Sequence, residues 1–154
     1  MLNMNKQKAS TLIEVLIAVS VIVLILTSVS AMISMLVRLA DSNERKQLAL
    51  LKAEEALEFF RKERSITSWF GFSTFIEDGA RYCISTLPES MASMSAQLGT
   101  CEDADVLEAA RYQFKREAAI DFDGENRATI SIDLMWQDGN KDKNLTIEQN
   151  FENY

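Results

Sequence analysis

The sequence contains no histidine, which removes the commonest general base and the commonest metal ligand of proteins. Its two cysteines, Cys83 and Cys101, are too few for a Cys-rich zinc site. The five glycines are scattered and form no nucleotide-binding loop, and no serine has a histidine to act as its base. We therefore expect no catalytic site, no metal ion and no cofactor, and we expect that the protein is not an enzyme.

Basic side chains are also in the minority. With 16 Lys and Arg against 23 Asp and Glu, the formal net charge is −7. Non-specific nucleic-acid binding needs clustered basic side chains that neutralise phosphates, so we expect no nucleic-acid partner for this acidic surface. The 154 residues suffice for one domain of ordinary size. The apolar residues, however, are concentrated in one block near the N-terminus.

That block, Val15 to Val37, contains no charge, no Gly and no Pro. About 20 apolar residues are enough for a helix to cross a hydrocarbon core, and a helix satisfies its own backbone hydrogen bonds there. A secretory signal peptide is the alternative, but its apolar core has only about 7–15 residues. Lys6 and Lys8 precede the block and Glu44 follows it. The positive-inside rule therefore predicts a cytoplasmic N-terminus, a single pass through the cytoplasmic membrane and a head outside it.

The residues just before the apolar block form a recognisable motif. They are Lys8, Ala9, Ser10, Thr11, Leu12, Ile13, Glu14, Val15 and Leu16. This stretch closely resembles the prepilin signal of type IV pilins and type II secretion pseudopilins, which has a basic leader, a small residue, an aromatic residue, then Thr-Leu-Ile-Glu and an apolar run. Ala9 stands where Gly is usual, and Ser10 where Phe is usual. The resemblance implies that a prepilin peptidase cuts between Ala9 and Ser10, and that Ser10 is then N-methylated.

Glu14 places a carboxylate at the start of the expected membrane helix, where a charge is expensive. Its position in the first turn lets its negative charge interact favourably with the helix dipole. In one interpretation this interaction is the only role of Glu14. The resemblance implies a second interpretation, in which Glu14 neutralises the free amine of a neighbouring mature N-terminus and so selects subunits for assembly. Many major pilins carry a proline midway through this helix, where Ala31 stands here. That departure favours a minor pilin or a pseudopilin.

Beyond Arg38 the sequence keeps a helical pattern but acquires charges. Glu58 and Lys62 form a favourable i, i+4 pair, and no proline interrupts the pattern. We predict one helix from about Thr11 to Arg64, roughly 80 Å long. A sheet should cover its apolar face, and a coiled coil is the alternative. The apolar face consists of Ala49, Leu50, Ala53, Ala56, Leu57 and Phe60.

The head is expected to end in an antiparallel meander of three strands. Apolar residues alternate in each strand, as a half-buried sheet requires, and turn residues separate the strands. The alternating positions are Tyr112, Phe114, Ala118, Ile120 and Phe122, then Ile130, Ile132, Leu134 and Trp136, then Leu145, Ile147 and Phe151. The turns are Asp123–Asn126 and Asp138–Asn140. We expect their acidic residues to serve as turn residues, and a calcium site is the alternative.

The segment between the long helix and the meander is less regular. Arg81–Thr86 is predicted to be a short strand, Pro88–Gly99 a short helix or a loop, and Asp103–Ala110 a short helix. Four aromatic residues are expected to seal the junction between helix and head, although a ligand is an alternative; they are Trp69, Phe70, Phe72 and Phe75. Because disulfides persist outside the cytoplasm, we expect a bridge between Cys83 and Cys101, with two free thiols as the alternative.

The predicted fold class is α+β, with a long N-terminal helix packed on a C-terminal antiparallel sheet. Residues 1–9 are the expected leader, 10–37 the membrane and assembly half of the helix, 38–65 its amphipathic half, and 66–154 the head. A minor type IV pilin-like subunit is the leading functional hypothesis, with a minor pseudopilin of type II secretion second. An anchored receptor or adhesin outside any filament is the third. The expected partners are prepilin peptidase, other pilins or pseudopilins through the helix, and the cytoplasmic membrane.

Overall fold

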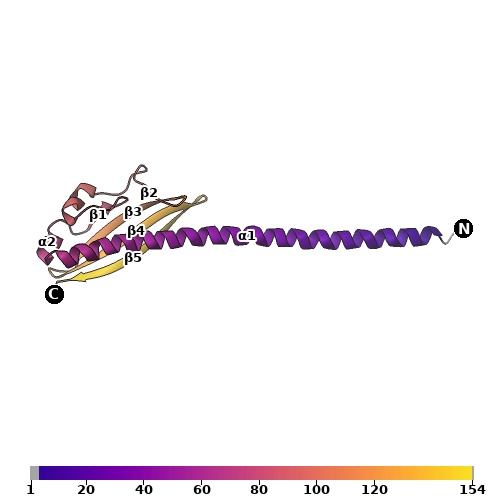
Figure 1. Cartoon of the computed structure of the whole chain (residues 1–154), viewed down its shortest axis with the longest axis horizontal. Coiled ribbons are helices and arrows are strands. Elements are labelled where there is room, and N and C mark those ends of the chain that lie inside the picture. The colour runs from indigo at the N-terminus through magenta and orange to yellow at the C-terminus, as the bar shows by residue number, and fades with distance from the viewer. Residues whose placement is uncertain (1–3, 154) are drawn as a thin grey trace. The chain divides into compact units, whose positions relative to one another are not determined.

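A computed structural model describes the backbone of residues 4–153 and the side chains of residues 12–153. The chain divides into two compact units, Met1–Asn43 and Glu44–Tyr154, and each is described by itself. The described residues of the first unit, 4–43, are all helical, whereas the second unit contains a sheet. In chain order the elements are α1 (Met4–Ile66), α2 (Trp69–Ser73), β1 (Ala80–Cys83), the 3-10 helix η1 (Met91–Gln97), β2 (Leu107–Ala109), β3 (Tyr112–Phe122), β4 (Arg127–Asp138) and β5 (Lys141–Glu152) (Figure 1).

Helix α1 has 63 residues and is longer than the sequence predicted at both ends. It begins at Met4 rather than near Thr11, and it ends at Ile66 rather than at Arg64. No Gly or Pro occurs within it, so no residue in the helix removes a backbone donor or favours a break. The chain then turns at Ser68, whose side chain accepts a hydrogen bond from the Gly71 amide and caps the short helix α2.

The sheet has the strand order β1-β3-β4-β5, and every pair in it is antiparallel. The short strand β2 pairs with the beginning of β3. The predicted three-stranded meander is therefore confirmed as β3, β4 and β5, joined at the two predicted turns. Gly124 and Gly139 occupy those turns with φ of 72° and 64°, a conformation that glycine adopts without strain.

The core of the second unit lies between one face of the sheet and the later part of α1, which lie over each other in Figure 1. Ala49, Ala53, Ala56 and Phe60 are fully buried, which confirms that a sheet covers this stripe of the helix. Leu50, predicted to join them, is 42% exposed. Position 50 follows directly after the buried Ala49, and adjacent residues of a helix point about 100° apart. The strands contribute, among others, Phe114, Ala118, Ile120, Ile130, Ile132, Leu134, Trp136 and Phe151.

The prediction of a helix over Asp103–Ala110 is wrong. The end of this segment is β2, whose Leu107 pairs with Phe114 of β3. Ala, Leu and Glu favour helix, but their preferences amount to only a few tenths of a kcal/mol per residue. Tertiary contacts override them here, because the Ser85 hydroxyl donates to the Asp105 carbonyl and the preceding Cys101 is bonded to β1.

The aromatic residues after α1 do not all seal the junction. Phe72 is fully buried and packs against Phe151, and Trp69 packs against Phe122 while its Nε1 donates to the Glu125 carbonyl at 2.7 Å. Phe70, in contrast, is 79% exposed. Phe70 and Phe72 are two positions apart in helix α2, so their side chains point about 200° apart and only one of the two can face the core.

Candidate assembly site

The first unit presents an apolar surface with no protein cover. The helix is long and apolar enough to cross a membrane by length and composition. Its large apolar side chains between Leu12 and Leu39 are all exposed, with Val29 at 48% the most covered among them. An isolated soluble helix of this composition would expose far more contiguous apolar area than soluble proteins tolerate. The surface therefore requires lipid or other apolar helices around it.

Hydroxyl side chains within this segment are satisfied by the helix itself. Ser20 donates to the Leu16 carbonyl at 2.7 Å, and Ser34 donates to the Ser30 carbonyl at 3.0 Å. Thr27, Ser28 and Ser30 make equivalent bonds three or four residues back. These bonds matter in lipid, where an unpaired polar group costs several kcal/mol. The hydroxyls consequently add little to the cost of insertion.

Glu14 is thus the only charged side chain from Leu12 to Val37. It is exposed on α1, and it has no hydrogen-bond or ion-pair partner among the side chains that the structure describes. Ala9 and Ser10 belong to α1, but their side chains lie outside those that the structure describes. The expected cleavage between these two residues stays a prediction. A lone carboxylate in an apolar segment gains most from a partner supplied by another molecule.

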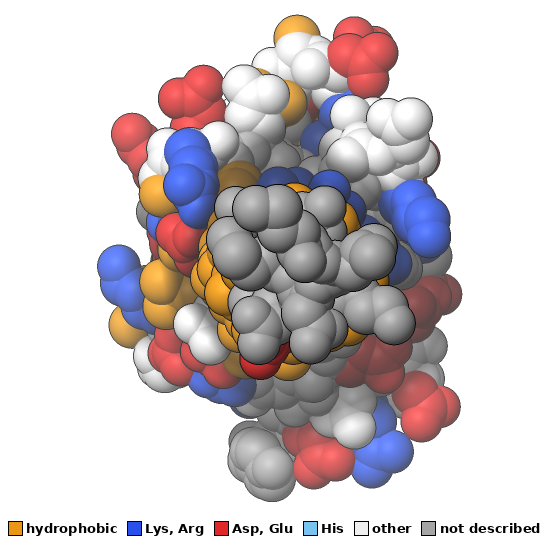
Figure 2. All heavy atoms as spheres, turned by 90° about the vertical axis from the view of Figure 1, so that its right-hand side faces the viewer, with side chains coloured by type: hydrophobic (Ala, Val, Ile, Leu, Met, Phe, Trp, Pro, Cys, Tyr) orange, Lys and Arg blue, Asp and Glu red, His pale blue; other side chains and the backbone are white. Residues whose placement is uncertain are grey.

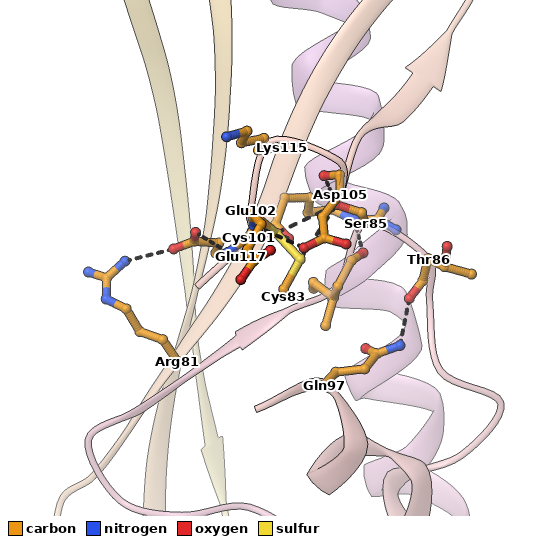
Figure 3. Close-up of a disulfide and its surroundings, with 12 residues drawn as sticks. Arg81, Cys83, Ser85, Thr86, Gln97, Cys101, Glu102, Asp105, Lys115 and Glu117 are labelled. Carbon is orange, nitrogen blue, oxygen red and sulfur yellow. Dashed lines mark hydrogen bonds and ion pairs between the residues drawn. A yellow bond between two sulfur atoms is a disulfide. The ribbon is translucent and has the colours of Figure 1, made fainter. Parts of the chain in front are cut away.

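The head contains a disulfide between Cys83 and Cys101, which joins the end of β1 to the loop before β2 (Figure 3). The Cys101 amide donates to Glu117 Oε1 at 2.9 Å, which holds this loop on β3. Lys115 and Asp103 form a second link at 2.7 Å, and this ion pair lowers the pKa of the Asp103 carboxyl. Covalent and polar contacts together fix the irregular part of the head against the sheet.

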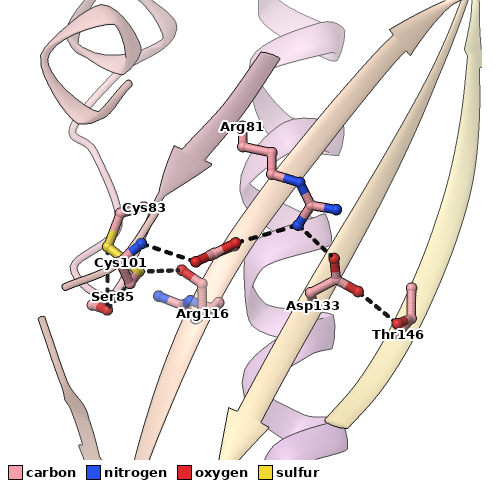
Figure 4. Close-up of polar contacts among 8 residues, drawn as sticks. Arg81, Cys83, Ser85, Cys101, Arg116, Asp133 and Thr146 are labelled. Carbon is pink, nitrogen blue, oxygen red and sulfur yellow. Dashed lines mark hydrogen bonds and ion pairs between the residues drawn. A yellow bond between two sulfur atoms is a disulfide. The ribbon is translucent and has the colours of Figure 1, made fainter. Parts of the chain in front are cut away.

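The outer face of the sheet carries a row of polar contacts that crosses four strands (Figure 4). Arg81 Nη1 on β1 lies 3.3 Å from Glu117 Oε2 on β3 and 3.4 Å from Asp133 Oδ2 on β4. Asp133 in turn accepts a hydrogen bond from the Thr146 hydroxyl on β5. Glu117 is only 4% exposed, so its carboxylate depends on these donors for compensation.

Two buried charges that sequence reasoning missed attach the helix to the rest of the head. Arg116 is 1% exposed; its Nε donates to the Ile84 carbonyl at 2.9 Å and its Nη1 to the Lys52 carbonyl of α1 at 2.8 Å. Burial lowers the pKa of this guanidinium, while the charge of Glu55 acts in the opposite direction. Glu63 of α1, 6% exposed, accepts from the Met91 amide at 2.9 Å. For Arg116 the sequence did contain a signal. It is a charged residue at an even position of β3, and the other even positions carry apolar residues that face the core.

Further contacts join α1 to the hairpin of β4 and β5. Arg45 pairs with Asp138 at 3.1 Å, Arg61 Nε donates to Gln149 Oε1 at 2.6 Å, and Arg64 Nη2 donates to the Glu152 carbonyl at 3.0 Å. Helix and strand β5 therefore run in the same direction.

The head surface seen in Figure 2 intersperses acidic and basic side chains. Among the residues that the structure describes, no group of three or more potential metal-ligating side chains is assembled, including the acidic turns.

An extended apolar helix with one carboxylate, followed by a small head built on an antiparallel sheet, defines the α+β architecture of type IV pilin-like proteins. Residues 4–30 match the family model of the prokaryotic N-terminal methylation motif. The chain therefore carries a type IV prepilin-like signal, and the resemblance found in the sequence is confirmed over this segment. Comparison with curated proteins and with solved structures gives no match. The motif and the architecture indicate a structural protein of the pilin or pseudopilin type.

Proposed function

We propose that the chain is a minor type IV pilin-like subunit, which is incorporated into a type IV pilus or primes its assembly for adhesion, motility or DNA uptake. The observation that carries this proposal is the prepilin-like motif over residues 4–30 leading without a break into an apolar helix with exposed side chains. A minor role is favoured because Ala31 and its neighbours provide no proline or glycine at mid-helix.

The proposed maturation begins with removal of residues 1–9. Prepilin peptidase cuts between Ala9 and Ser10, and the new N-terminal residue, Ser10, is methylated. Residues 10–37 then hold the subunit in the cytoplasmic membrane with its N-terminus inside, and later pack among other stalks. Residues 38–65 carry the head, residues 66–154, which lies outside the membrane and reaches the cell surface in the pilus.

Glu14 is proposed to select subunits by pairing with the N-terminal ammonium of a neighbour. During assembly the helix leaves lipid and packs among other helices, where little water is available. A buried charge left without its partner costs about 3–5 kcal/mol, which corresponds to more than a hundredfold in incorporation. If Glu14 only complemented the helix dipole, its loss would cost about 0.3–1 kcal/mol.

The experiment compares cleaved subunit in sheared filaments with cleaved subunit left in membranes for the wild type, Glu14→Val and Glu14→Gln. Both substitutions should leave insertion and cleavage unchanged, because these depend on Val15–Val37 and on the leader, and both should abolish efficient incorporation. Glu54→Gln, which removes an exposed carboxylate from the later part of α1, is the matched control and should assemble normally. Wild-type incorporation of both Glu14 variants would refute the assembly role and favour an anchored receptor.

A minor pseudopilin of type II secretion is the alternative within the same class. Both roles need the signal, the helix and Glu14, so the Glu14 experiment does not separate them. The neighbouring genes do: pilus retraction genes support the pilus role, whereas secretin and secretion-ATPase genes support the pseudopilus role.

A further inference from the structure

The two edges of the sheet differ in how they are covered. On the β1 side, the segment before Cys101 lies along the strand, and the Gly99 amide donates to the Arg81 carbonyl at 2.7 Å. The disulfide between Cys83 and Cys101 holds the end of this segment in place. The β1 edge is therefore already occupied, which is one way in which proteins protect a sheet edge.

Strand β5 forms the other edge, and its backbone is paired on one side only. All 12 of its residues are in register with β4, and within residues 4–153 it pairs with no other strand. The pair Asp138 and Lys141 closes a two-residue turn, so these two residues bond to each other and the bonding alternates along the strand. Odd-numbered residues of β5 therefore bond to β4, and even-numbered residues direct their N–H and C=O groups away from it.

Contacts at the end of β5 agree with this alternation. The amide of Asn153, an odd position, donates to the Asn126 carbonyl, whereas the carbonyl of Glu152, an even position, accepts from Arg64. Among the described residues, no hydrogen bond from another backbone group reaches the outward groups of five even positions, which are Asp142, Asn144, Thr146, Glu148 and Asn150. The edge thus offers a row of backbone donors and acceptors to a further strand.

Apolar side chains on β5 are also incompletely covered. Leu145 and Ile147 lie on the helix-facing side and are only half-buried, whereas their partners in β4, Leu134 and Ile132, are fully buried. Strand β4 has a neighbour on each side, but within the described chain β5 has a neighbour on one side only. The missing cover is therefore the cover that a further strand would supply.

The flank of α1 on the β5 side exposes a third apolar side chain. Arg61 Nε donates to Gln149 of β5, so the flank that carries Arg61 faces this strand. Leu50 precedes Arg61 by about three helical turns and therefore points to the same side, where it is 42% exposed. Leu50 thus belongs to the same incompletely covered apolar surface as Leu145 and Ile147.

We propose that the β5 edge binds the β5 edge of a second copy of this chain by antiparallel pairing, which joins two heads into a closed dimer. A two-fold axis through the paired strands gives both copies the same contacts, as in most homodimers. The β1 edge is occupied, so the pairing ends with two copies and does not continue into a fibre. This inference concerns residues 44–153 alone. It goes beyond the proposed pilin role and requires neither membrane insertion nor filament assembly.

The charges along β5 select one register for this pairing. Even-numbered residues carry the outward groups, so they pair only with even-numbered residues of the copy. With Thr146 on the two-fold axis, Asn144 lies opposite Glu148 of the copy and Asp142 lies opposite Asn150 of the copy. Each of these carboxylates then faces an amide side chain that can donate to it. A shift by two residues in either direction sets Asp142 opposite a glutamate instead, and like charges directly opposite destabilise a sheet.

The same register also fits the apolar surface and the ends of the strands. On the helix-facing side, Leu145 of each copy lies opposite Ile147 of the other, so each strand covers the half-buried side chains of its partner. Residues 141–143 carry two lysines and one aspartate. They lie beside residues 148–152 of the copy, which carry two glutamates and no basic residue. Backbone, apolar and charged groups are thus all matched by β5 itself, which identifies a second copy as the occupant.

The first test follows amide hydrogen exchange of the full chain in detergent micelles at increasing protein concentration. A fixed ratio of detergent to protein keeps the number of chains in each micelle constant. Well above the dissociation constant, exchange at Asn144, Thr146 and Glu148 should slow by about tenfold or more. The amides of Leu145 and Ile147, which already bond to β4, should not change. Copies that associate through the apolar helix alone would leave the edge amides unprotected, and that result overturns the inference.

Two substitutions at one position separate the edge from the fold. Thr146→Pro removes the central outward N–H without removing a bond to β4, and should raise the dissociation constant of the dimer by about tenfold or more. Thr146→Val keeps that N–H while losing the same hydroxyl contact to Asp133, and should associate as the wild type does. Exchange at Asn144 and Glu148 measures both constants. Association of Thr146→Pro at the wild-type level overturns the inference.

A charge swap tests the register. Asn150→Asp keeps a side-chain oxygen that accepts from the Thr129 hydroxyl, but it sets a carboxylate opposite Asp142 of the copy twice in each dimer. It should raise the dissociation constant by about tenfold. Adding Asp142→Asn restores a carboxylate–amide pair and should restore wild-type association. Positions 142 and 150 of one chain lie roughly 26 Å apart along the strand, so this rescue acts only between copies. A double variant that associates as weakly as Asn150→Asp alone overturns the proposed pairing.

Discussion

Arg116 offers the sharpest test of how the head is held on its helix. Its guanidinium crosses the core to reach Lys52 of α1 and Ile84 beyond β1, and it is 1% exposed. Hydrogen bonds from a charged donor are worth about 1.5–3 kcal/mol each, but burying the charge costs several kcal/mol. The net contribution is consequently smaller than the sum of the two bonds, and different substitutions should reveal different parts of it.

Arg116→Met fills most of the space and removes the charge. The Lys52 carbonyl keeps its intrahelical partner, so only the buried Ile84 carbonyl loses a donor, at a cost of about 1–3 kcal/mol that the relieved desolvation partly offsets. We expect a net loss of about 1–2 kcal/mol. Arg116→Ala loses the same bonds and leaves a cavity as well, so we expect about 3–4 kcal/mol.

Thermal unfolding of the full chain in detergent, followed by near-ultraviolet circular dichroism of the head, measures both losses. A head of this size should lose about 4 °C or more of Tm per kcal/mol. Lys115→Ala, the neighbouring basic residue on the opposite face of β3, is the control and should cost no more than about 1 kcal/mol. If Arg116→Ala unfolds within about 2 °C of the wild type, the guanidinium does not tie the sheet to α1 and the reasoning fails.

The other predictions concern the leader, the disulfide and one strained turn. Ala9→Arg should leave the precursor uncut, and mass spectrometry of membrane-extracted protein should then find the intact leader where the wild type begins at Ser10. Replacing both Cys83 and Cys101 by Ser should lower the free energy of unfolding by roughly 3 kcal/mol in the chain-entropy model; an unchanged denaturation midpoint would contradict this. Ala110 has a φ of 54° in the two-residue turn between β2 and β3, so Ala110→Gly should stabilise the head by about 0.5–1 kcal/mol. Ala109→Gly, in the strand beside it, should destabilise instead.

The spacing of apolar residues predicted the helix and the strands whose formation depends mainly on one requirement, the burial of their apolar side chains. The helix followed from an apolar block joined to an i, i+3, i+4 stripe, and the meander followed from alternation interrupted by Gly-containing turns. The stripe nevertheless included Leu50, because apolar character alone does not say how wide the covered face of a helix is. The spacing of apolar residues predicts which side of the helix is buried. The sheet that packs on that side determines how wide the buried stripe is.

The segment from Arg81 to Ala110 was harder because long-range contacts determine it. Its residues between Asp103 and Ala110 have helical preferences, yet the chain there is held by Ser85, by the disulfide and by pairing with β3. Arg116 and Glu63 were missed for a related reason. A buried charge is stable only with partners, and those partners come from positions about 30 to 60 residues away in the sequence, where no local pattern reveals them.

The change of pattern along α1 separates two kinds of requirement within one helix. From Leu12 to Leu39 the helix is apolar all round apart from Glu14, a few hydroxyls and Arg38, as a helix in lipid must be. From Glu44 onward the buried residues form one stripe, and the other faces carry mainly charged side chains that water solvates, with Leu50 and Leu51 exposed among them. Substitutions in the first part, and substitutions of head residues that bond to the second part, should therefore fail at different steps. Glu14→Val should give a normally folded head that is not incorporated, whereas Arg116→Ala should give a cleaved, membrane-inserted subunit whose head unfolds at lower temperature. A variant of either kind that produced both defects would show that assembly and head stability are coupled through α1.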